Sequence, residues 1–139
     1  MSTTASPFDP HAFPDDLVAA QRRAAELHVA LHRLQARLPW SREPHKGWPE
    51  QTERGKEHPG RPATEGWPAE DAVEFDRLLE DLRETTGIVQ SHEWWGICDR
   101  EGVKGAALVA ARMALKRAPG AVPDEDVPAL APEDVQQAA

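Results

Sequence analysis

Apolar residues recur at alternating intervals of three and four along the first third of the chain. The stripe consists of Leu17, Ala20, Ala24, Leu27, Leu31, Leu34 and Leu38. This spacing places all seven side chains on one face of an α-helix. Pro14 suits a first helical turn, and Pro39 stops the pattern. Asp15 and Asp16 stand where the helix dipole favours acids. The pattern predicts a helix over residues 15–38.

Two further helical patterns follow after a long interruption. The second covers residues 69–90, and its apolar face contains Phe75, Leu78, Leu79, Leu82 and Val89. Gly87 lowers the helix propensity near its end. The third covers residues 101–117 and has two adjacent apolar stripes. They are Val103, Ala106, Ala110 and Met113 on one side, and Leu108, Ala111 and Leu115 on the other. So broad an apolar surface predicts that this helix packs against two neighbours.

The loop over residues 39–67 has no helical period and is interrupted by proline and glycine. These residues are Pro39, Pro44, Gly47, Pro49, Gly55, Pro59, Gly60, Pro62 and Gly66. Proline removes a backbone donor and restricts the residue before it, so we expect an extended or irregular connection. A Gly-Trp-Pro unit occurs twice, at residues 47–49 and 66–68. We expect Trp67 to cover the start of the second helix, and Trp94 and Trp95 to close one end of the helical domain.

Charge separates the ends of the 139-residue chain from its middle. The first 16 residues contain three acids and the last 21 contain five, and neither segment has a Lys or Arg. The formal net charge of −8 therefore lies in the two ends, and the segment between them is balanced. We expect disordered segments over residues 1–14 and 119–139, around a helical domain over residues 15–118.

The three predicted helices alternate in charge. Residues 22–37 sum to +3, residues 70–84 to −5 and residues 100–117 to +4. An acidic helix between two basic ones favours a bundle, although exposed ion pairs contribute only about 0–1 kcal/mol each. We therefore expect an all-α fold, a small three-helix bundle with a long loop that contains Pro and Trp. The alternative interpretation is that the first and third helices share a basic face for an acidic partner.

Several classes of protein are disfavoured by simple features of the chain. No apolar run approaches the roughly 18 residues of a membrane helix, and one cysteine excludes an internal disulfide. Residues 1–12 have neither the basic start nor the apolar stretch of a signal peptide. We expect a cytoplasmic protein that has no membrane partner.

The candidate chemistry is sparse. Metal-capable side chains cluster only at His92, Glu93, Cys98 and Asp99, and one Cys with one His falls short of the spaced pairs typical of zinc sites. Cys98 and His92 could meet in a turn, but nothing in the sequence supplies an oxyanion hole. A phosphate-binding glycine loop is also missing. We therefore expect no enzyme activity, no catalytic residue, no metal and no cofactor.

Protein binding is the function that the sequence favours. Trp40 and Trp48 lie in a loop too polar to build a core, and exposed aromatic residues are frequent interface anchors. Packing of both residues over the helices is the alternative. Basic residues at the ends of the first and third helices would steer an acidic surface, or would complement helix dipoles. The predicted partner-binding residues are Trp40, Trp48, Arg33, Arg37, Arg112, Lys116 and Arg117.

Two alternatives stay open. A direct DNA-binding regulator would use the second and third helices as a helix-turn-helix, although the third helix is rich in alanine where a recognition helix is polar. A homodimer could bury the leucine stripe of the first helix between two copies.

The runs His92–Trp95 and Val109–Lys116 resemble segments of small uncharacterised proteins of high-GC actinobacteria. Some of these proteins are encoded on integrative plasmids near replication or transfer genes. The resemblance spans about residues 17–117 and implies an accessory or regulatory protein of a mobile genetic element. Its most concrete form is an activator of replication or transfer.

Overall fold

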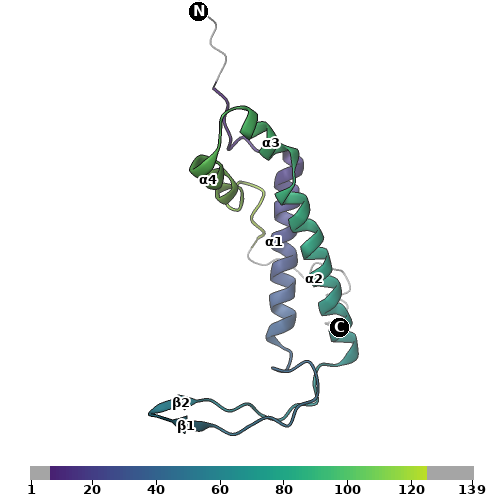
Figure 1. The fold of residues 1–139 in the computed structure, drawn as a ribbon. Coiled ribbons are helices and arrows are strands. Elements are labelled where there is room, and N and C mark those ends of the chain that lie inside the picture. Colours follow the sequence, from purple (N-terminus) through teal and green to yellow (C-terminus); the bar gives the residue numbers. More distant parts are fainter. Residues whose placement is uncertain (1–6, 125–139) are drawn as a thin grey trace, which may run out of the picture.

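The computed structural model describes residues 7–124 and is mostly helical (Figure 1). The elements in chain order are α1 (Asp15–Ala36), β1 (Gln51–Glu53), β2 (Lys56–His58), α2 (Ala69–Gln90), α3 (Glu93–Arg100) and α4 (Gly105–Leu115). Helices α1 and α2 lie side by side and run antiparallel, with α3 and α4 at one end of the pair. The two strands lie beyond the opposite end, away from the helices.

Leucine packing holds α1 against α2. We call this contact the leucine seam; it consists of the buried side chains Leu27, Leu31, Leu34 and Leu78, with Ala30 among them. Phe75, Leu79 and Leu82 of α2 pack around it and are partly buried. The stripe predicted for the first helix is confirmed, since its members are buried or half-buried. Helix α2 continues unbroken through Gly87, because burial of Val89 holds its last turn in place.

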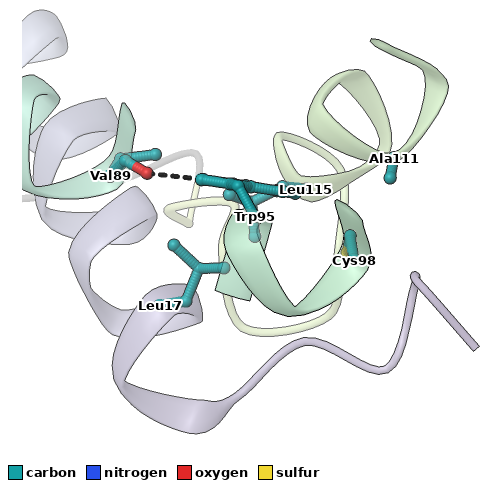
Figure 2. Packing of buried hydrophobic residues seen from close by; sticks show 6 residues of the cluster. All are labelled: Leu17, Val89, Trp95, Cys98, Ala111 and Leu115. Carbon is teal, nitrogen blue, oxygen red and sulfur yellow. Dashed lines mark hydrogen bonds between the residues drawn. The ribbon is translucent and has the colours of Figure 1, made fainter. Parts of the chain in front are cut away.

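A second apolar cluster joins α3 and α4 to the end of the helix pair (Figure 2). Its buried members are Leu17, Val89, Trp95, Cys98, Ala111 and Leu115. The Trp95 indole Nε1 donates a hydrogen bond of 2.7 Å to the Val89 carbonyl oxygen, which fixes α3 to the end of α2. Trp94 packs beside Phe8 with ring centroids 5.3 Å apart. The two tryptophans therefore close this end of the helical domain, as the sequence predicts.

Between the second and third predicted helices, where the sequence predicts no helix, the structure contains α3. This helix begins at an unusual cap, because the His92 ring Nδ1 accepts a hydrogen bond of 2.9 Å from the Trp94 amide. The other ring nitrogen, Nε2, lies 3.0 Å from an Asp16 carboxylate oxygen at the start of α1. A histidine cap is not among the usual sequence signals for a helix start, so the pattern alone did not reveal α3.

Two other predictions about the architecture are wrong. The fold is not purely α-helical, because residues 39–67 contain a β-hairpin. Helix α4 is shorter than the predicted helix over residues 101–117, and it does not bury both apolar stripes, since Ala111 and Leu115 are buried while Ala106, Ala110 and Met113 are exposed. Helical spacing shows how many stripes a helix has, but not how many neighbours the fold provides.

The chain ends also differ from the predicted disorder where the structure describes them. Phe8 and Phe13 pack against the apolar cluster of Figure 2, and Ala121 is fully buried. Arg22 of α1 donates a hydrogen bond of 3.2 Å to the Val122 carbonyl. The rest of the predicted terminal segments, residues 1–6 and 125–139, lies outside the described residues. Between residues 7 and 124, no helix combines the length and the apolar character needed to cross a membrane.

The leucine seam predicts a clear difference between two substitutions. Leu27→Ala removes a fully buried side chain and should lower the free energy of unfolding by about 2–5 kcal/mol. Val73→Ala on α2, which is 68% exposed, should change it by less than about 0.5 kcal/mol. Urea denaturation followed by circular dichroism measures both. Equal losses would show that the seam does not carry the stability of the helix pair.

Candidate functional site

A long β-hairpin, which we call the arm (residues 41–66), projects from the end of the α1–α2 pair (Figure 1). Its pairing keeps one register, from His45 opposite Thr64 to Glu53 opposite Lys56. The tip is a two-residue turn of Arg54 and Gly55, with φ angles of 55° and 78°. Two positive φ angles are typical of the tight hairpin turn that matches strand twist. The paired strands are therefore roughly 30 Å long at about 3.3 Å per residue.

At the first Gly-Trp-Pro unit, the backbones of the two strands of the arm approach each other very closely. The Gly47 amide donates to the His45 ring Nδ1 at 2.8 Å, and the Trp48 amide donates to the Arg61 carbonyl at 2.9 Å. Gly47 has a φ of +76°, and a Cβ atom there would collide with the backbone of Arg61. Only glycine fits at this close approach of the two backbones.

The second unit repeats the same arrangement at the base of the arm. The Gly66 amide donates to the Thr64 hydroxyl oxygen at 3.1 Å, and the Trp67 amide donates to the Arg42 carbonyl at 2.9 Å. Gly66 has a φ of +89° and packs against the backbone of Arg42. The recurring tripeptide therefore marks two structurally equivalent positions at which the two sides of the arm approach each other closely.

Three aromatic rings, Trp40, His45 and Trp48, form a cluster at the inner part of the arm. Their centroids lie 4.9–5.7 Å apart and the rings meet edge to face, a favourable geometry for aromatic pairs. The Trp40 indole Nε1 donates to the Pro62 carbonyl at 2.7 Å, and the Arg61 guanidinium lies 5.8 Å from the Trp40 ring. Trp40 is half-buried, whereas Trp48 is 45% exposed. Trp40 and His45 therefore pack against the Trp48 ring and leave part of it exposed to solvent.

The base of the arm is attached to α2 through Arg42. Its guanidinium makes two hydrogen bonds of 2.8 Å to the two carboxylate oxygens of Asp76. It also lies 5.3 Å from the Trp67 ring centroid. Trp67 in turn packs against Phe75 of α2 at 4.9 Å, so it covers the start of that helix as predicted. The Arg42 hydrogen bonds hold the pKa of the Asp76 carboxyl below its usual range.

A shallow open pocket of about 450 Å³ lies beside the aromatic cluster. Its lining residues are Pro44, His45, Lys46, Ala63, Thr64 and Glu65. They come from both strands of the arm and are mostly exposed. His45 lines this pocket and also belongs to the aromatic cluster, so the two features adjoin.

The charges of the arm are balanced. It contains five Lys or Arg residues and five Glu residues, and all ten are exposed. Binding to nucleic acid depends on an excess of positive charge, because affinity comes largely from contacts to phosphates. The arm lacks that excess.

The basic residues predicted for partner binding lie in two separate places. Arg33 and Arg37 lie at the end of α1 near the arm, whereas Arg112, Lys116 and Arg117 belong to α4 and the residues after it (Figure 1). Most of α1 separates them, or roughly 30 Å at 1.5 Å per residue. Arg112 is also engaged inside the fold, 4.5 Å from the centroid of the Trp95 ring. The two groups therefore cannot form one basic face.

The side chains considered for catalysis and metal binding are buried or hydrogen-bonded within the fold. Cys98 is fully buried in the apolar cluster of Figure 2, and burial raises the pKa of its thiol, which disfavours the thiolate. Both ring nitrogens of His92 are engaged, one in the α3 cap and one with Asp16. Across residues 7–124, no group of three or more His, Cys, Asp or Glu side chains is arranged to hold a metal ion.

Sequence reasoning missed three residues of the site, namely Arg42, His45 and Arg61. A signal was available, because each Gly-Trp-Pro unit is preceded two positions before its glycine by a side chain that can accept a hydrogen bond. Nothing in the sequence indicated which carbonyl each tryptophan amide would meet across the arm.

Residues 16–118 match a protein family described as a domain of unknown function (DUF8825). The chain belongs to this family. The match takes in the whole arm together with α2, α3 and α4, so the arm is part of the DUF8825 domain. No curated protein and no solved structure matches the chain.

The close approach of the two backbones at Gly47 predicts that a substitution of this residue causes a local defect in this DUF8825 domain. Gly47→Ala should weaken the pairing of Trp48 with Arg61 by about 1–2 kcal/mol or more, because alanine disfavours a positive φ and its Cβ meets the opposite backbone. Amide hydrogen exchange at Trp48 and Arg61 should accelerate, while exchange within the leucine seam stays unchanged. Gly87→Ala is the matched control, since a Cβ there meets nothing and should favour the helix. Equal effects in both variants would contradict the prediction.

The Arg42–Asp76 contact predicts a dependence on pH. Since the pKa of Asp76 is lowered in the folded state, the contact stabilises the docked arm above the ordinary Asp pKa of about 3.9. It is lost as the pH falls through the lowered value. The indole NMR signal of Trp67 should therefore shift in acid for the wild type and stay constant for Asp76→Asn. Identical titrations of the two proteins would rule out the contact as the cause.

Proposed function

We propose that this protein is a non-enzymatic accessory protein of the cytoplasm that binds a protein partner through the arm. The observation that carries the proposal is Trp48, an exposed tryptophan supported by Trp40 and His45 on an element that projects from the helices. Tryptophan is among the residues that contribute most to binding at protein interfaces.

The polar outer half of the arm supports the same proposal. Strands β1 and β2 are exposed at every position and bury no apolar side chain. An isolated two-stranded hairpin is only marginally stable in water. A partner that packs against the ribbon would supply the contacts that the helices do not.

The balanced charge of the arm favours a protein partner over a nucleic acid, and a direct DNA-binding regulator is the alternative. In its most specific form, the protein is an activator of replication or transfer of a mobile genetic element. This form rests on the resemblance to the actinobacterial plasmid proteins, and the geometry of the arm is compatible with it.

Affinity capture with matched variants tests the proposal. Tagged wild-type protein and Val73→Ala should recover the same protein from the native cytoplasm, with or without nuclease treatment. Trp48→Ala should reduce recovery roughly 30-fold, corresponding to about 2 kcal/mol for the loss of an interface anchor. Trp48→Phe keeps an aromatic ring in the cluster and should retain part of the binding.

Two results would contradict the proposal. If Trp48→Ala captures the partner as well as the wild type, Trp48 is not an anchor. If recovery disappears with nuclease and falls steeply with salt, contacts to phosphates dominate, and the DNA-binding alternative is favoured.

A further inference from the structure

Helix α4 presents an apolar face to solvent on the side opposite its buried residues. We call it the outer α4 face; it consists of Ala106, Val109, Ala110 and Met113, all exposed. Val109 is 60% exposed and Met113 54%. The intervals of three and four between these residues place them in one stripe along the helix. The opposite side is anchored in the core through Ala111 and Leu115, so the face is held on a fixed helix.

The outer α4 face differs from the other exposed apolar residues of the protein. Val73 and Ile88 on α2 are each isolated, with acids or other polar residues around them in the sequence, and isolated apolar residues are normal on protein surfaces. The four residues on α4 are contiguous. The sequence pattern predicts a second neighbouring helix on this side of α4. The described part of the chain supplies none.

The charged residues of the α4 segment itself are all basic, and Lys104 forms an ion pair of 2.7 Å with Asp99 of α3. Residues 102–118 contain Lys104, Arg112, Lys116 and Arg117 and no acid. Lys116 and Arg117 follow Met113 by three and four positions, so they continue the line of the stripe. Neither makes an ion pair within residues 7–124. A ligand that lies along the stripe therefore meets apolar side chains first and two available cations at its end.

We propose that the outer α4 face is a docking site for an acidic amphipathic helix of a partner protein. A helix that lies on α4 would pack its apolar residues on Val109 and Met113 and place its acids beside Lys116 and Arg117. Ala106 and Ala110 are small, so they permit a close approach of the second helix. The proposal goes beyond the binding role of the arm, because this face lies near the other end of the helix pair (Figure 1).

Charge and composition favour this occupant over two others. A second copy of α4 would place its own Lys and Arg residues against these, and like charges disfavour that contact. A lipid surface is usually bound through Trp, Phe or Leu on the apolar face, and the outer α4 face has none of them.

A pair of synthetic helical peptides tests the proposal. The first has about 14 residues, or four turns, with Leu at intervals of three and four and Glu on the flanks. The second is identical but carries Lys for each Glu. Fluorescence anisotropy with the full-length protein should show binding of the Glu peptide, at least about tenfold tighter than binding of the Lys peptide.

Three variants locate the binding on α4. Val109→Glu should weaken binding of the Glu peptide about tenfold or more, because it puts a like charge in the apolar stripe. Val73→Glu is the matched control and should not change it. Lys116→Glu combined with Arg117→Glu should reverse the preference between the peptides. Since all of these side chains are exposed, unchanged circular dichroism spectra will verify folding.

Four results would overturn the proposal: equal affinity for both peptides, no effect of Val109→Glu, preferential binding of the protein to vesicles of anionic lipid, or a dimer in sedimentation equilibrium that Val109→Glu dissociates. Trp48→Ala should leave binding of the Glu peptide unchanged. A failure of the arm proposal is thereby distinguished from a failure of this one.

Discussion

The packing of Leu27, Leu31 and Leu34 against Leu78 is the contact on which the other parts of the molecule depend, because it fixes α1 and α2 antiparallel. Antiparallel packing defines two ends. The arm leaves from one end, where Arg42 binds Asp76 on α2. At the other end, Trp95 joins α3 to the last turn of α2. If the two long helices separated, the cluster around Trp95 would lose Leu17 of α1.

A fold built on one helix pair leaves a large fraction of its surface without a neighbour. A full bundle would cover both sides of the seam, whereas here α3 and α4 cover only the end that contains Leu17. Two features follow from this incomplete coverage of the helix pair. The arm lies away from the helices, and α4 is packed on one side only. Both candidate interaction surfaces are therefore consequences of the same incomplete arrangement.

The sequence predicted those elements whose structure is decided by burial along a helix. The apolar faces of α1 and α2 and the bounds of α2 follow from helical spacing, whereas α1 ends at Ala36, two residues before its predicted end. The arm was missed because its strands are polar on both faces, so period-two alternation was absent, and its turn is Arg54–Gly55, which lacks the usual Asn-Gly or Asp-Gly signal. Trp40 and Trp48 were picked out by composition. Their support by His45 and Arg61 depends on pairing across the arm, which spacing along one strand does not contain.

The two chain segments that flank the arm touch each other. The Trp67 indole Nε1 donates a hydrogen bond of 2.9 Å to the Pro39 carbonyl oxygen, so the chain leaves the helix pair and returns to it at one point. The arm is therefore an insertion in a helical hairpin that a short turn could close. Within a single register, one residue added to each strand lengthens the ribbon by about 3.3 Å and reverses its faces, and two restore them. The reach of this domain can thus change in discrete steps, without changing a contact in the leucine seam.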